Sequence, residues 1–110
     1  MEINIAARHF DVTEGLREHV MQKMQKLDKY SLVIVSAHVV FDVQKIAQIC
    51  EIVLSGKNLR MAAVERTNDI YASFDASVAN LQKQLSRYHE KIKDHRKNQH
   101  EIPTQEDQGL

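Results

Sequence analysis

The sequence predicts an α+β fold, a four-stranded sheet with two helices packed on one face, in the order β-α-β-β-β-α. The spacing of apolar residues switches to a helical period twice along the chain, and three β-type runs stand between those two segments. Each helix has only one apolar stripe, so both can cover the same face of one sheet. The 110 residues suit one domain, and 3 Gly and 1 Pro leave most of the chain free to form regular structure.

The N-terminal third is predicted to form a strand followed by a helix. Residues 2–7 alternate between apolar and other side chains, which is typical of a short strand. The next apolar residues recur at i, i+4, i+8 and i+11, and they are Leu16, Val20, Met24 and Leu27. Thr13 is the N-cap candidate, and Gly15 weakens the first turn by up to about 1 kcal/mol relative to Ala. We expect a right-handed crossover from the first strand to the sheet.

Three β-type runs follow, and they can form an antiparallel meander. Residues 36–43, 48–55 and 58–66 each place alternate apolar side chains on one face. These side chains are Ala37, Val39, Phe41 and Val43, then Cys50, Ile52 and Leu54, then Leu59, Met61 and Ala63. Residues 55–58, Ser-Gly-Lys-Asn, have the composition of a hairpin turn. The join at 44–48 is less clear, and we expect a longer hairpin loop there.

The last element is predicted to be a long helix. Asn68 or Asp69 can cap its start. One apolar stripe then continues for about six turns through Ile70, Phe74, Val78, Leu81, Leu85, Tyr88 and Ile92. Beyond Asn98 the pattern dissolves into polar residues and Pro103. We therefore expect one domain over residues 1–98 and a flexible polar and acidic tail over 99–110.

Basic residues gather on this last helix although the whole chain is neutral. Lys+Arg and Asp+Glu number 15 each, but six basic and two acidic residues between 83 and 97 give that segment a formal charge of +4. At about 100° per residue, a row forms on the side opposite the apolar stripe, and it consists of Asn80, Lys83, Arg87 and Lys91. In the first helix Lys26 and Lys29 point away from the stripe, and Lys23 lies at its edge.

These basic rows allow two interpretations. Two helices side by side would form a groove lined with flexible cations, which suits a phosphate backbone. A row of Lys and Arg on a helix is more often a solvated face balanced by i, i+4 pairs, and zero net charge argues against a nucleic-acid binder. On the residues alone, the solvated face is favoured.

Residues for catalysis or metal binding do not form a recognisable motif. The six His residues show no HExxH spacing, and the sequence has neither a Gly-rich phosphate loop nor G-x-S-x-G. The single cysteine, Cys50, sits mid-strand, where a small buried hydrophobe is its expected role. No stretch approaches the roughly 20 apolar residues of a membrane span. We therefore expect no enzymatic activity, metal, cofactor, small-molecule substrate or membrane, and a cytoplasmic location.

Three passages carry a resemblance to a known family. The opening shows Asn4-Ile5, Thr13, Leu16-Arg17, Val20, Lys26-Leu27 and Tyr30. Residues 38–43 read HVVFDV, and the last helix opens with Asp69, Ile70, Tyr71, Phe74 and Asp75 before NLQKQLSR. Together these passages resemble the ribosome hibernation-promoting factor family, also called ribosome-associated inhibitors or sigma-54 modulation proteins. The likeness covers residues 1 to 96.

The resemblance implies both a fold and a function. Family members have a β-α-β-β-β-α domain similar to a double-stranded RNA-binding domain. They bind the 70S ribosome in the decoding-centre channel of the small (30S) subunit, where they block mRNA and tRNA during stress or stationary phase. The implied contacts are basic residues against 16S rRNA. With Lys29 added from the pattern above, the candidate set is Lys23, Lys26, Lys29, Lys83, Arg87 and Lys91.

Departures from the family pattern bear on this hypothesis. Asn80 stands where a lysine is usual, and Lys83 stands where an arginine is common, which keeps the charge but loses the planar fork. The ending QEDQGL does not reproduce the acidic tail of the ribosome-associated inhibitor. The alternative function is a protein-interaction module that modulates a transcription factor such as sigma-54.

Overall fold

The computed structural model describes residues 1–30 and 33–97, with side chains described as far as Glu90. Its element order is the predicted β-α-β-β-β-α, with a short 3-10 segment, η1, added after the first helix. The elements are β1 (Glu2–Arg8), α1 (Glu14–Met24), η1 (Gln25–Tyr30), β2 (Ile34–Gln44), β3 (Ala47–Gly56), β4 (Leu59–Thr67) and α2 (Ile70–Lys97). The predicted tail at 99–110 lies outside the described residues.

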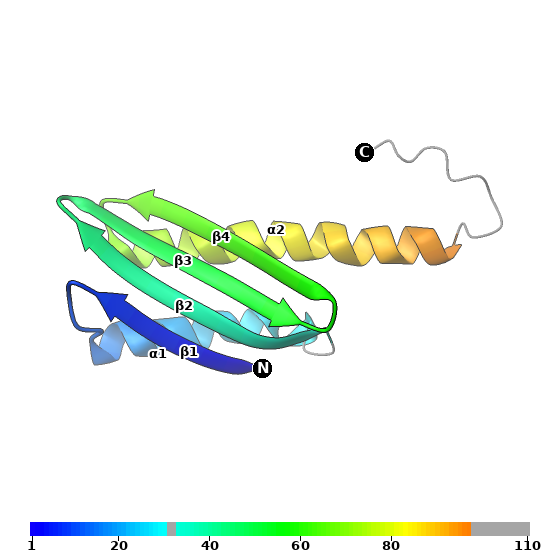
Figure 1. Cartoon of the computed structure of the whole chain (residues 1–110), viewed down its shortest axis with the longest axis horizontal. Coiled ribbons are helices and arrows are strands. Elements are labelled where there is room, and N and C mark those ends of the chain that lie inside the picture. The colour runs from blue at the N-terminus through cyan, green and yellow to red at the C-terminus, as the bar shows by residue number, and fades with distance from the viewer. Residues whose placement is uncertain (31–32, 98–110) are drawn as a thin grey trace.

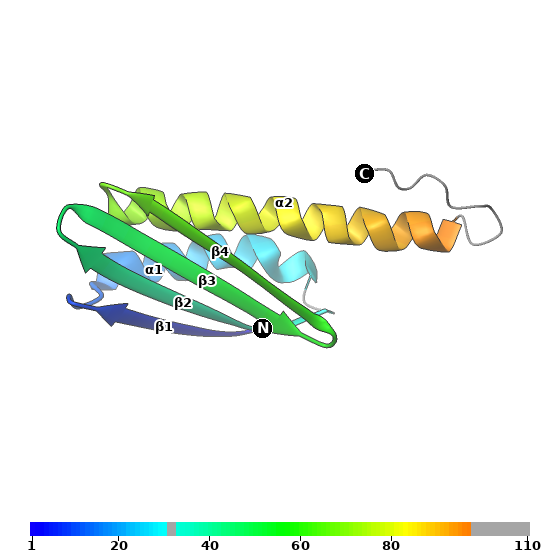
Figure 2. The same cartoon turned by 45° about the horizontal axis from the view of Figure 1, so that its top comes forward.

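The four strands form one mixed sheet in the order β1-β2-β3-β4. β1 runs parallel to β2, as a helical crossover requires, and β2, β3 and β4 form the predicted antiparallel meander. Both helices lie behind the same face of the sheet, side by side (Figures 1 and 2). The predicted α+β architecture is therefore confirmed.

Alternating strand residues and the two helical stripes meet in one core. Every buried position on α1 and η1 belongs to the predicted stripe, and β2 and β3 contribute the predicted alternate residues. The fully buried side chains include Leu16, Val20, Met24, Leu27, Val39, Phe41, Ile52, Leu54, Phe74, Leu81 and Leu85. Burying a side chain of this size contributes about 1.5–3 kcal/mol. Among the predicted inward residues of β2, Val43 is only half-buried, because it lies one residue from the strand end.

The first helix ends earlier than the stripe indicated. α1 stops at Met24, and Leu27 lies on the 3-10 segment η1. A 3-10 helix has about three residues per turn, so a residue three positions after Met24 returns to the same side. Leu27 therefore stays fully buried although the α-helix has ended.

Both hairpin turns are tight, and the loop expected at 44–48 is a wrong prediction. Gln44 pairs with Ala47, so Lys45 and Ile46 alone form the turn. Lys45 has a φ of 58° and Asn58 in the second turn has a φ of 57°. A left-handed backbone is common for asparagine but not for lysine, which is why the sequence marks only the second turn.

α2 is anchored to the sheet through two buried serines. Ser73 donates its hydroxyl to the Gln48 carbonyl, and Ser77 donates to the Cys50 carbonyl at 3.1 Å. Asp69 caps the helix, because its Oδ1 accepts from the Tyr71 amide at 3.1 Å. Among the α2 side chains described, which run to Glu90, the last buried one is Leu85, and the ribbon continues beyond the edge of the sheet (Figure 1).

Candidate nucleic-acid interface

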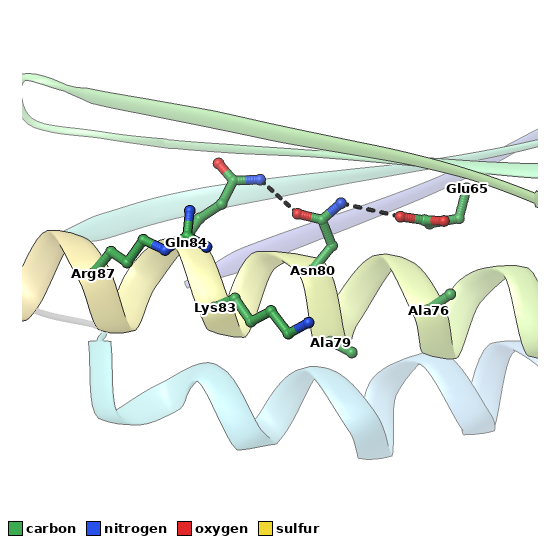
Figure 3. Close-up of a pocket in the computed structure, with 7 residues that line it drawn as sticks. All are labelled: Glu65, Ala76, Ala79, Asn80, Lys83, Gln84 and Arg87. Atoms are coloured by element: carbon green, nitrogen blue, oxygen red, sulfur yellow. Dashed lines mark hydrogen bonds between the residues drawn. The ribbon is translucent and has the colours of Figure 1, made fainter. Parts of the chain in front are cut away.

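A groove between α2 and the edge strand β4 brings together two of the predicted basic residues, Lys83 and Arg87. The groove has a volume of about 350 Å³ and is open to solvent. Its lining consists of Glu65, Ala76, Ala79, Asn80, Lys83, Gln84 and Arg87 (Figure 3). Lys83 and Arg87 are exposed, so their cations can contact a large anionic partner.

Asn80 was predicted to lie on the solvent side of α2, and this prediction is only partly right. The residue is half-buried, and its Nδ2 donates to Glu65 Oε2 at 3.0 Å. Gln84 Nε2 donates both to Asn80 Oδ1 and to the Ala62 carbonyl, each at 2.9 Å. Helical angles alone could not show this, because the contact depends on where β4 lies.

This amide chain also covers part of the edge of β4. The Ala62 carbonyl that accepts from Gln84 is a main-chain acceptor of an edge strand. Exposed edge groups of this kind can pair with another chain, and a side chain that occupies them reduces that risk. Gln84 therefore has a structural role as well as a place in the groove.

Lys23 lies in the seam between α1 and α2. Its Nζ is 3.8 Å from Asp75 Oδ1, and the side chain is 33% exposed. The same Asp75 oxygen accepts from His19 Nε2 at 2.7 Å. The His19 ring packs edge-on against Tyr71, with ring centroids 5.0 Å apart. Lys23 is therefore partly engaged in contacts between the helices, although an ion pair this exposed is weak.

The remaining predicted cations lie elsewhere. Lys26 and Lys29 are exposed, as predicted, but they belong to η1 and not to an α-helix. The Lys29 Nζ lies 5.4 Å from the centre of the Tyr30 ring, within cation–π range. Lys91 belongs to α2, and its side chain lies outside the described part.

Two polar groove residues, Glu65 and Gln84, were not predicted, and neither were the two alanines of the lining. Glu65 continues the inward alternation of Leu59, Met61 and Ala63, and it is the one charged residue in that series. A carboxylate in an otherwise apolar series was the available signal. Gln84 gave no such signal, because a polar residue at the flank of a helix is ordinary.

Other titratable groups do not converge on a catalytic site within the described residues. Cys50 is fully buried, and desolvation raises the pKa of its thiol to about 12, so the thiolate is scarce at neutral pH. A hydrogen bond of 2.7 Å from His9 Nδ1 lowers the pKa of Asp42. The side chains of residues 1–30 and 33–90 include no group of three or more His, Cys, Asp or Glu that could hold a metal ion. Within residues 1–30 and 33–97, no helix combines the length and apolar character needed to cross a membrane.

Comparison with known proteins gives consistent matches over most of the chain. Residues 3–93 match the family described as Sigma 54 modulation protein / S30EA ribosomal protein. The ribosome hibernation promoting factor of Salmonella typhimurium is 34% identical over 95 residues, a match covering 86% of this chain and 100% of that protein.

Solved structures give the same fold. The N-terminal domain of Thermus thermophilus Protein Y matches with a TM-score of 0.74 and 27% identity, over 80% of this chain and 99% of that one. A ribosomal subunit interface protein from Coxiella burnetii matches with a TM-score of 0.76 over 81% of this chain and 98% of that one. At 24% identity, the Coxiella match supports the fold alone.

Proposed function

The chain belongs to the Sigma 54 modulation protein / S30EA ribosomal protein family, and on that premise we propose that it is a ribosome hibernation factor. It binds the 70S ribosome at the 16S rRNA of the small (30S) subunit, in the decoding-centre channel. There it blocks mRNA and tRNA and so inhibits translation under stress or in stationary phase. It acts in the cytoplasm, where ribosomes are.

One observation carries this proposal. The chain spans 100% of the length of a relative named ribosome hibernation promoting factor, at 34% identity. A relationship over the whole of that protein supports a shared role better than a shared fold would, because one fold hosts many functions.

The proposed mechanism is steric and electrostatic, and the protein is not an enzyme. Occupancy of the channel excludes mRNA and tRNA, so no bond has to be made or broken. The rRNA phosphates are contacted by the basic residues of α1, η1 and α2, namely Lys23, Lys26, Lys29, Lys83, Arg87 and Lys91. The exposure of Lys83 and Arg87 on one flank of α2 supports this assignment. Such contacts release counterions, so the affinity falls as salt rises.

Cosedimentation with ribosomes at several salt concentrations tests the proposal. Each lost phosphate contact reduces the magnitude of the negative slope of log affinity against log salt by about 0.7–0.9. The slope of the K83E/R87E double variant should therefore be smaller in magnitude by about 1.4–1.8. K57E/R60E is the matched control, because it makes the same charge reversals at exposed residues of the β3–β4 hairpin. Binding that persists unchanged in high salt and in K83E/R87E would refute the proposal.

The alternative, a module that binds a protein such as sigma-54, gives a different result in a pull-down from lysate. A protein partner survives nuclease treatment, whereas association through rRNA does not. Retention of a single protein partner after nuclease, together with no ribosome binding at low salt, would favour the alternative.

A further inference from the structure

Glu65 is unexpected in a surface proposed to bind RNA. Its carboxylate lines the same groove as Lys83 and Arg87 (Figure 3). Among the described residues, no lysine or arginine lies within 4.0 Å of it as an ion-pair partner. An unneutralised carboxylate repels phosphate. If RNA enters this groove, Glu65 must face a part of the RNA that donates hydrogen bonds.

The carboxylate is held in place for such a contact. Gln84 is fixed by the Ala62 carbonyl, Asn80 is fixed by Gln84, and Asn80 donates to Glu65 Oε2. A carboxylate has about four acceptor sites on its two oxygens, so one bond from Asn80 leaves capacity for further donors. An acceptor ordered in advance loses less entropy when a ligand binds.

The rest of the lining suits a single nucleotide. Ala76 and Ala79 present methyl groups, which can contact the face of a base or a ribose. The two cations can hold the adjoining phosphates. A volume of about 350 Å³ is near the lower end of small-ligand sites, so the groove can admit one unstacked nucleotide but not a duplex. Proteins commonly recognise RNA through such unpaired bases.

We propose that this groove binds an unpaired guanine of RNA, with Glu65 accepting hydrogen bonds from its N1–H and N2 amino groups. Guanine presents these two donors side by side on its Watson–Crick edge, which matches the two oxygens of a carboxylate. Adenine and cytosine present one amino donor there, and uracil presents one imino donor. The inference rests on the proposed function, which supplies RNA as the ligand. It adds a preference for guanine to an interface whose other proposed contacts are with phosphates.

Kethoxal probing of purified bacterial small subunits tests the proposal. This reagent modifies N1 and N2 of unpaired guanine, the two groups assigned to Glu65. The samples contain wild type, E65Q, A79W or E51Q, each brought to equal occupancy as measured by cosedimentation. E65Q keeps one oxygen that can accept from Asn80, but its amide NH₂ replaces the second oxygen and cannot accept from guanine. A79W fills the groove with a large side chain. E51Q is the matched control, because Glu51 is also a strand glutamate but lies outside the groove lining.

We expect wild type and E51Q to protect a guanine that becomes reactive with E65Q and with A79W. With short labelled RNAs carrying one unpaired base, wild type should prefer guanine over inosine, which lacks the N2 amino group, by roughly tenfold. E65Q should lose that preference.

Identical protection by wild type and E65Q at equal occupancy would overturn the inference while leaving ribosome binding intact. If neither wild type nor any variant binds the subunit at low salt, the proposed function fails and the inference fails with it. The two failures are therefore distinguishable.

Discussion

Gly56 lies where no other residue fits, and replacing it with alanine should destabilise the fold. A Cβ at Gly56 would stand 1.7 Å from the Val33 carbonyl oxygen, 2.8 Å from its carbon and 3.2 Å from the Ile34 Cα. All three are backbone atoms, so no rotamer change can relieve the overlap. Gly56 does not have a positive φ, so the requirement is space and not a left-handed backbone.

The expected loss in free energy of unfolding follows from the displacement of β2 and β3 that a Cβ at Gly56 requires. Gly56 pairs with Ile34 at the irregular end of the β2–β3 ladder, and Ile34 is 1% exposed. Pushing the two strands apart there sacrifices much of the burial of Ile34, about 1.5–3 kcal/mol. It also sacrifices about 0.5–1.5 kcal/mol of backbone hydrogen bonding. We expect a total of about 2–4 kcal/mol, or about 8–16 °C in Tm for a domain of this size.

Urea and thermal unfolding followed by circular dichroism measure this loss, with G15A as the matched control. A Cβ at Gly15 would meet only the Tyr71 hydroxyl, at 3.2 Å, and that group ends a movable side chain. Because Gly15 lies in the first turn of α1, alanine there should be neutral or stabilising by up to about 1 kcal/mol. If G56A unfolds within about 0.5 kcal/mol of wild type, the size of an ordinary surface change, the reasoning is wrong.

Three further predictions concern two single side chains and one pair. The folded-state pKa of Asp42 lies below its ordinary value of 3.8, so the ionised carboxylate stabilises the fold above that pH and the benefit is lost as pH falls through the folded pKa. D42N should therefore have a lower free energy of unfolding than wild type at pH 7, and the difference between the two proteins should shrink as the pH drops below 3.8. A difference that stays constant with pH would exclude a stabilising contribution from the ionised Asp42. The Cys50 thiol, with a pKa of about 12, should react with a thiol reagent slowly when folded and quickly in denaturant; equal rates would contradict its burial. A double-mutant cycle of H19A and D75A, measured by urea unfolding, should give a coupling free energy of about 0.2–1 kcal/mol between the two side chains. Purely additive effects would show that their hydrogen bond does not stabilise the contact between α1 and α2.

The sequence predicts the parts of this fold that depend on periodicity. Alternation identified the inward faces of β2 and β3, and the i, i+4 stripes identified the buried faces of both helices, because burial selects apolar residues directly. The tight turn at Lys45 was missed, since lysine carries no signal for a left-handed backbone. The 3-10 turn was missed because Leu27 satisfies both helical periods.

The candidate site was harder to predict than the core. Exposure of Lys83 and Arg87 follows from their angle on the helix, and the structure agrees. The placement of Glu65 beside them depends on how β4 packs against α2, and the contacting residues, Glu65 and Asn80, belong to two different elements. Spacing along one element carries no information about such a contact.

The part of α2 beyond Leu85 has a separate consequence for dynamics. At about 1.5 Å per residue, the 28 residues of this helix span about 42 Å, and among the side chains described the buried ones lie on roughly its first half, up to Leu85. Amides on the supported half should exchange with solvent only when the domain opens, whereas those further along can exchange through local fraying. Hydrogen exchange along this one helix would then report two free energies in a single experiment, one for opening of the whole domain and one for fraying of the helix end. A ligand that binds the folded far end should raise both free energies by the same amount, because neither the frayed helix nor the unfolded chain keeps its site.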